Sequence, residues 1–243
     1  GVVEPLKIVK FWECAQLERE LLLKRSELDV DSVLLRVVKI VSDVRREGDK
    51  ALVHYTERFD GVKLDPEAIK VGDGEYALAF QQLKPEVRES LEKLAKAIER
   101  FHKKQLPKEW NIEMAPGVKA GQLVRPLEKV GIYVPGGLAK YPSTVLMAAV
   151  PARVAGVEHV IACTPPNQDG RVSPAVLVAA KIAGVDEVFK VGGAQAIAAM
   201  AYGTETVPKV DKIVGPGNVY VAAAKQVVAP NVDVDFVAGP SEI

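Results

Sequence analysis

Three glycine-rich turns carry the residues best placed to do chemistry in this sequence. They are the runs VPGG, VGGAQ and VGPGN, which end at Gly137, Gln195 and Asn218. Each follows a short apolar segment and precedes an alanine-rich one, as expected for a strand, a turn and the start of a helix. Glycine lets the backbone approach a ligand, and helix N-termini offer free N–H groups to a phosphate or carboxylate. Glycine also occupies turns that bind nothing, but three such turns together favour a binding crevice.

Strands and helices alternate after residue 130, and this alternation has to position the turns. Helices between strands need right-handed crossovers and a parallel sheet covered on both faces, so all three turns would open at one edge. The predicted fold class is α/β, with a Rossmann-like parallel sheet domain. Strands are predicted at residues 130–134, 157–163, 187–191, 211–214 and 233–237, and helices at 144–155, 173–184, 195–202 and 218–228.

The chain before residue 130 has a different, mainly helical pattern. Residues 29–129 are predicted to be an α+β portion of a second, incomplete domain, the first part of a further Rossmann-like unit, with a β-hairpin around Pro116-Gly117. An N-terminal helical arm is predicted for residues 1–28, and the Rossmann-like sheet domain for residues 130–243. A stripe of apolar residues marks the first long helix; its members are Val33, Val37, Ile40, Val41 and Val44.

Groups that could catalyse a reaction are sparse. Cys163 ends a predicted strand without a base or cation beside it, so a buried, packed cysteine is the prediction. The histidines His54, His102 and His159 lie far apart and lack metal-type spacing. No G-x-G-x-x-G follows the first strand, and the second ends in CTPP without the acid that usually binds a ribose. The residues therefore predict a binding crevice without a catalytic group.

Composition restricts the classes of partner. The 243 residues hold 32 basic and 32 acidic side chains, which argues against nucleic acid or a membrane surface as a partner. Two cysteines form no disulfide framework and favour a reducing compartment. No apolar run is long enough for a membrane span, and the N-terminus lacks a signal-peptide core, so a cytoplasmic protein is expected.

The order of the motifs resembles the histidinol dehydrogenase family. The run VGIYVPGGLAKYPS is followed by VGGAQA, VGPGN and AGPSE, and the earlier FDG and FHKKQ also look like that family. The resemblance implies a zinc- and NAD-dependent dehydrogenase of histidine biosynthesis. Such enzymes oxidise L-histidinol to L-histidine through histidinal, taking four electrons, and are homodimers.

Site residues follow from the same resemblance. It implies that Tyr133, Gln195 and Asn218 contact NAD, so that residues 130–243 are an NAD-binding domain, and that Ser241 contacts the substrate. The family's zinc ligands and its Glu-His acid/base pair lie beyond AGPSE, whereas this sequence ends at Ile243. We therefore expect a truncated chain that is inactive alone, with no catalytic or metal-ligating residue of its own. We also expect an exposed apolar surface that could support a non-native dimer.

Two other functions stay open at this point. One is a stand-alone nucleotide- or anion-binding α/β module without catalysis. The other is an unrelated α/β oxidoreductase whose catalytic thiol is Cys163.

Overall fold

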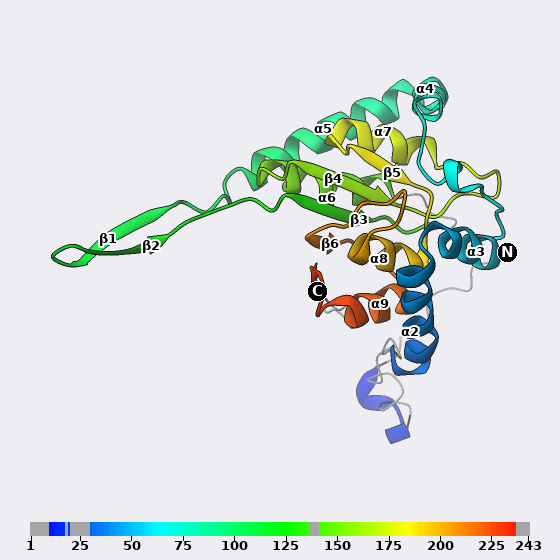
Figure 1. Ribbon diagram of the computed structural model, residues 1–243, viewed down its shortest axis with the longest axis horizontal. Helices are drawn as coiled ribbons and strands as arrows, with labels where there is room; N and C mark the ends of the chain where they lie inside the picture. The colour runs from blue at the N-terminus through cyan, green and yellow to red at the C-terminus, as the bar shows by residue number, and fades with distance from the viewer. Residues whose placement is uncertain (1–9, 18, 20–29, 137–140, 237–243) are drawn as a thin grey trace.

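A computed structural model describes residues 10–17, 19, 30–136 and 141–236. A five-stranded sheet in the order β5-β4-β3-β6-β7 forms its centre, and each neighbouring pair is parallel (Figure 1). The strands are β3 (Lys129–Tyr133), β4 (His159–Cys163), β5 (Glu187–Phe189), β6 (Lys212–Val214) and β7 (Asp233–Val234).

The strands are apolar on both faces because helices cover both. In β3, Val130 and Ile132 pack into one hydrophobic cluster, and Tyr133 packs into the other. Valine and isoleucine, which fill these strands, suit a pleated surface that is buried on both sides. The fold class predicted from the alternating pattern is confirmed.

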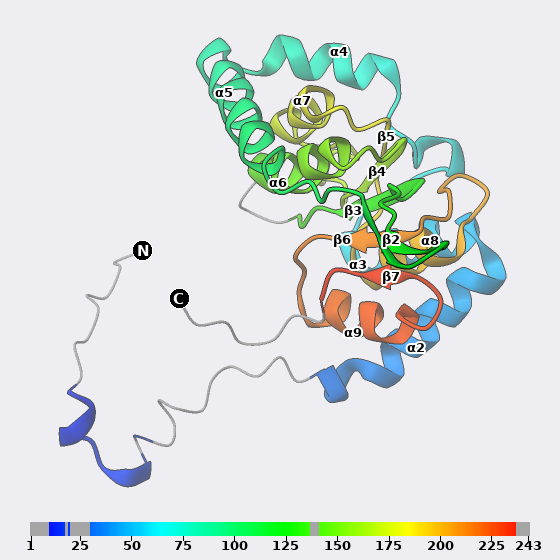
Figure 2. The ribbon, with the colours of Figure 1, turned by 90° about the vertical axis from the view of Figure 1, so that its left-hand side faces the viewer.

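Two groups of helices complete a three-layer arrangement, with the sheet in the middle (Figure 2). One layer holds α2 (Val30–Glu47), α3 (Asp49–Asp60), α8 (Gly193–Tyr202) and α9 (Val219–Val228). The other holds α4 (Asp73–Gln82), α5 (Pro85–His102), α6 (Pro142–Val154) and α7 (Pro174–Ala183). Two short 3₁₀ turns lie at Phe11–Glu13 and Pro66–Ala68.

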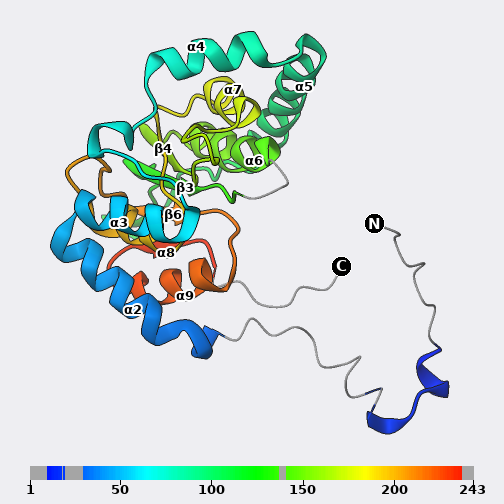
Figure 3. The same ribbon diagram turned by 90° about the vertical axis from the view of Figure 1, so that its right-hand side faces the viewer.

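Helix α2 packs along α8 and α9 through the apolar stripe seen in the sequence (Figure 3). All five members of that stripe are buried, and Val37 and Val44 are completely so. Helices from residues 30–102 thus cover both faces of the sheet that residues 129–234 form. The predicted division of the chain near residue 129 stays a prediction.

A long β-hairpin leaves the body of the molecule (Figure 1). Strands β1 (Trp110–Ala115) and β2 (Val118–Gln122) pair antiparallel through a turn in which Gly117 has φ 78°. Every residue of both strands is exposed. The predicted hairpin is confirmed, and so are the five strands and four helices predicted after residue 130, with ends shifted by a few residues.

Across the described ranges, no helix has both the length and the apolar character needed to cross a bilayer.

Candidate functional site

The sheet reverses its winding direction between β3 and β6. The chain runs from β3 outward to β4 and β5, then returns to place β6 on the other side of β3. The loops after β3 and β6 therefore leave in opposite directions at the carboxyl edge of the sheet. In open α/β sheets, ligands bind in the crevice that forms at this switch point.

A cavity of about 480 Å³ lies at this edge. Its lining takes residues from all three glycine turns: Pro135 and Gly136 after β3, Gly193 at the start of α8, and Asn218 just before α9. The end of α3 closes another side with Phe59 and Asp60. The prediction that the three turns open on one crevice is confirmed.

Tyr133 joins the first turn to the second. It ends β3 with only 4% of its surface exposed, and its hydroxyl oxygen accepts a hydrogen bond from the Gly193 N–H, 3.0 Å away. Burial, together with the nearby carboxylate of Asp60, raises the pKa of Tyr133 to about 12. The phenol therefore keeps its proton at neutral pH and can donate it to a ligand oxygen.

Gln195 lies in the first turn of α8, at the wall of the same cavity. Only 1% of the residue is exposed, and its Oε1 atom is buried without a hydrogen-bond partner among the described residues. A buried acceptor without a hydrogen bond costs free energy. A ligand that donates a hydrogen bond to Gln195 Oε1 would remove this cost, which favours its binding.

Asn218 caps the N-terminus of α9. Its Oδ1 atom accepts hydrogen bonds from the N–H groups of Tyr220 (3.1 Å) and Val221 (3.2 Å). The residue lies at the cavity wall and is exposed. Since the cap uses the carbonyl oxygen, the side-chain NH₂ is the group available to a ligand.

A buried ion pair fixes the third turn. The Lys225 Nζ donates to the carbonyl oxygen of Gly215 (2.5 Å) and to the Asp235 carboxylate (2.6 Å), and the Gly215 N–H donates to the same carboxylate (2.8 Å). Gly215 has φ 122°, and a Cβ there would lie 2.2 Å from the carbonyl oxygen of Tyr133, so only glycine fits. Sequence reasoning missed this pair, because a lone lysine in an alanine-rich helix gives no sign of its partner.

Asp60, the last residue of α3, was also missed as a site residue. The sequence showed it only as part of the FDG run that resembles a known family. The structure places it in the cavity wall with Tyr133, Gln195 and Asn218. Burial raises the pKa of its carboxyl group to about 6.

Two other predicted positions have different outcomes. Cys163 is fully buried, and burial raises the pKa of its thiol, so the prediction of a buried, packed cysteine is confirmed. This burial argues against the alternative in which Cys163 is a catalytic thiol. Ser241, the predicted substrate contact, lies outside the described residues.

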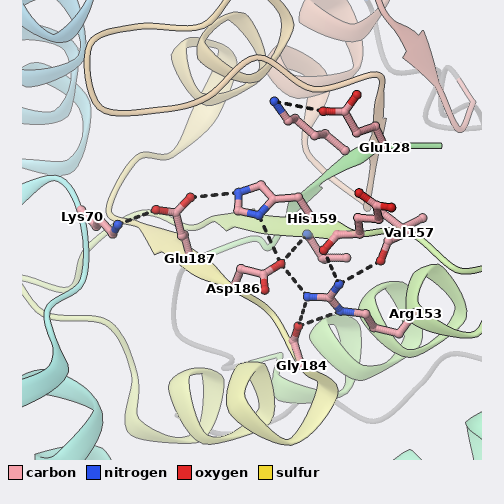
Figure 4. A network of polar contacts seen from close by, with 11 residues as sticks. Lys70, Glu128, Arg153, Val157, His159, Gly184, Asp186 and Glu187 are labelled. Atoms are coloured by element: carbon pink, nitrogen blue, oxygen red, sulfur yellow. Dashed lines mark hydrogen bonds and ion pairs between the residues drawn. The ribbon is translucent and has the colours of Figure 1, made fainter.

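The carboxylates Asp186 and Glu187 belong to an ion-pair network at the opposite edge of the sheet, where β4 and β5 begin (Figure 4). His159 Nε2 lies 3.0 Å from Glu187 Oε2, and Lys70 also binds Glu187. Asp186 pairs with Arg153 at 2.5 Å. These groups hold the amino ends of the strands together. Within the described parts of the chain, no three His, Cys, Asp or Glu side chains cluster as a metal site would require.

A larger hollow of about 650 Å³ lies at the root of the β-hairpin. Its walls are mainly apolar and include the exposed side chains of Leu106, Leu127, Met147 and Phe236. The exposed apolar surface expected from the sequence is found here. Few polar groups converge on this hollow, so the smaller cavity at the switch point is the better candidate for a specific ligand site.

Comparisons with known proteins agree on one family. The family profile described as "Histidinol dehydrogenase" matches residues 23–243. A relative named histidinol dehydrogenase from Methanothermobacter thermautotrophicus is 57% identical over 222 residues, which cover 91% of this chain and 52% of the relative. One from Methanocaldococcus jannaschii is 48% identical over 244 residues, covering 100% of this chain and 56% of the relative.

A solved structure supports the same relationship at the level of the fold. The crystal structure of histidinol dehydrogenase from Elizabethkingia anophelis matches with a TM-score of 0.82 at 42% identity. The match covers 86% of this chain and 48% of that chain. The present chain thus spans about half the length of the relatives that it matches. With sequence and fold both matched over nearly its whole length, the chain belongs to the histidinol dehydrogenase family.

Proposed function

We propose that the cavity at the switch point binds NAD, and that this chain is the NAD-binding part of an enzyme that oxidises L-histidinol to L-histidine. One observation carries the proposal. Tyr133, Gln195 and Asn218, which come from different turns and are expected from the resemblance to contact NAD, line the same cavity. Bound NAD supplies the acceptor for the hydride that leaves the substrate.

The polar groups of the cavity suit a dinucleotide. Tyr133 offers a protonated hydroxyl, Asn218 a side-chain NH₂, and Gln195 an unpaired carbonyl oxygen. These groups can bind the ligand's oxygens and N–H or O–H groups, while the apolar walls at Ile40 and Pro165 exclude water. The residues therefore orient the cofactor, and none of the three has to change its own protonation state.

The other family properties enter as proposals. Zinc, the substrate L-histidinol and a homodimer are proposed for the assembled enzyme, together with contact between Ser241 and the substrate. The described residues bring no metal cluster together, so no zinc ligand among them is proposed. A cytoplasmic location is proposed on the same family grounds.

A titration of this chain with NAD⁺ by isothermal calorimetry tests the proposal. We expect weak but measurable binding, since groups on the substrate side are not among the cavity residues. Asn218→Asp keeps the acceptor that caps α9 but removes the NH₂ donor, so it should weaken NAD⁺ binding about tenfold without loss of thermal stability. Asn231→Asp, on the exposed surface after α9, is the matched control. A tight NAD⁺ complex that survives Asn218→Asp would contradict the assignment.

A further inference from the structure

The end of helix α3 is fixed at the rim of the cavity. Gly61 follows α3 in the left-handed conformation, and its N–H donates to the carbonyl oxygen of Glu57 at 3.2 Å. The side-chain amide of Gln168, in the loop after β4, donates to the carbonyl oxygen of Asp60 at 3.0 Å. The Asp60 carboxyl group is therefore held at the carboxyl edge of the sheet by contacts of its own backbone.

This carboxyl group lacks the partners that a buried acid normally has. Its Oδ2 atom is enclosed and has no hydrogen-bond partner among the described residues. The pKa of about 6 means that it is mostly ionised at neutral pH in a site that disfavours the charge. Gln195 Oε1 is a second unpaired acceptor in the same wall. Two acceptors without donors indicate a ligand that brings hydroxyl or N–H groups to this end of the cavity.

The other residues that line this cavity are unsuited to binding a further phosphate group on the ribose of the ligand. Of the described residues that line the cavity, none is lysine or arginine. A 2′-phosphate on a nucleotide ribose is normally accommodated by an arginine, whereas a free 2′-hydroxyl is bound by an acidic side chain. The strand that usually supplies this acid is the second one, and here β4 runs into Thr164 and Pro165 instead.

We infer that Asp60 replaces the missing strand-end acid: its carboxylate binds the vicinal hydroxyls of the adenosine ribose and repels a 2′-phosphate, so that it selects NAD⁺ over NADP⁺. The inference rests on the proposed NAD site and adds a residue from outside the sheet to it. The neighbouring Phe59 also lines the cavity, and 53% of its surface is exposed, so its ring would give the adenine base an apolar contact beside this carboxylate.

Calorimetric titrations with NAD⁺ and NADP⁺ test the inference. The wild-type chain should bind NAD⁺ more tightly than NADP⁺. Asp60→Asn should weaken NAD⁺ binding at least about tenfold, the loss expected when hydrogen bonds to a charged group disappear, and should bring the two affinities close together. Asp60→Glu keeps the charge and should keep the discrimination. Asp65→Asn removes an exposed acid outside the cavity and should behave as wild type.

A second measurement uses the wild-type chain alone and so does not depend on how a variant folds. Hydroxyl donors from the ribose stabilise the ionised carboxylate, so NAD⁺ binding at pH 6 should release protons. Titrations in buffers of different ionisation enthalpy detect this release.

The outcomes separate the inference from the proposed function. If Asn218→Asp weakens NAD⁺ binding but Asp60→Asn changes neither the affinity nor the preference over NADP⁺, the inference is wrong and the NAD site stands. If the wild-type chain binds NAD⁺ without proton release at pH 6, the inference is wrong as well. If it binds no NAD⁺, both fail.

Discussion

The hydroxyl oxygen of Tyr133 accepts a hydrogen bond from the backbone N–H of Gly193, across 3.0 Å. This bond connects the end of β3 with the start of α8, two elements that lie sixty residues apart in the chain. It also uses one lone pair of the phenol oxygen while leaving the proton free. The same side chain therefore holds two turns together and presents a donor to the cavity between them.

Tyr133→Phe removes the hydroxyl group, which accepts the Gly193 hydrogen bond and offers a donor to the ligand, without changing the packing of the ring. The ring stays, but the Gly193 N–H loses its acceptor, so the free energy of unfolding should fall by about 1–2 kcal/mol. NAD⁺ affinity should fall about tenfold because a donor is lost. Urea denaturation and calorimetry measure the two effects. Tyr141→Phe, at an exposed tyrosine, is the control, and equal losses in both variants would show that the hydrogen bond has no special role.

Lys225→Met should strongly destabilise the chain, because the ammonium group that it removes is buried. Lys225 is 3% exposed, and its removal leaves the Asp235 carboxylate without its cation and the Gly215 carbonyl without its donor. Breaking such a buried pair costs about 3–5 kcal/mol. The loss is measured by urea denaturation.

A neighbouring pair offers the control for this change. Lys212 and Asp233 also pair at 2.5 Å, but in a more exposed position, so Lys212→Met should cost about 0–1 kcal/mol. Similar costs at the two lysines would show that burial does not set the strength of the Lys225 pair.

Asp60→Asn should stabilise the ligand-free chain at neutral pH while it weakens ligand binding. Burial raises the Asp60 pKa from 3.8 to about 6, so the folded chain holds this proton more tightly than the unfolded chain does. Wild-type stability therefore falls as the pH rises from about 4 to about 6, and the penalty is fully present above that window. A pKa raised this far corresponds to about 3 kcal/mol, and contact with water lowers the expected penalty to about 1 kcal/mol.

Thermal melts of wild type and Asp60→Asn between pH 3.5 and pH 8 measure this difference. The variant should melt higher above pH 6, and the two curves should converge as the pH falls below 4, where the wild-type group becomes protonated in the unfolded state as well as in the folded one. A constant offset at every pH would assign the effect to packing and not to ionisation.

This chain, supplied with zinc, L-histidinol and NAD⁺, should give no NADH. No histidine lies in the lining of the cavity that the structure describes, and the described residues bring no metal cluster together. General acid–base catalysis needs a side chain within hydrogen-bond reach of the reacting group. Absorbance at 340 nm follows the reaction. Steady turnover at the level of a full-length relative would contradict this prediction.

The sheet and its turns were predictable because their signals are local. The alternation of β-branched strands with alanine-rich helices, and the polar residues directly after each turn, already predict that Gln195 and Asn218 meet at one edge. The hairpin was predictable from Pro116-Gly117 between two short β-type segments. These features depend on residues close together in the sequence.

Asp60 and the pair of Lys225 with Asp235 were not predictable, because each depends on tertiary contacts. Asp60 reaches the cavity only because α3 packs beside α8 and its last residue is tied to Gln168. Lys225 lies ten residues from both of its partners, on a helix that could in principle have faced solvent with that side chain. No spacing rule links a residue to partners that the fold brings to it from another element.

The fully exposed hairpin should unfold locally, separately from the sheet. Its eleven strand residues contribute no buried side chains, and a lone two-stranded ribbon is at best marginally stable in water. Its amide protons should exchange with solvent through local fraying, whereas those of β3 and β4 should exchange only when the whole sheet unfolds. Among the described residues, a protease should accordingly cut first near Lys119, close to the tip of the ribbon, and leave the three layers around the cavity intact.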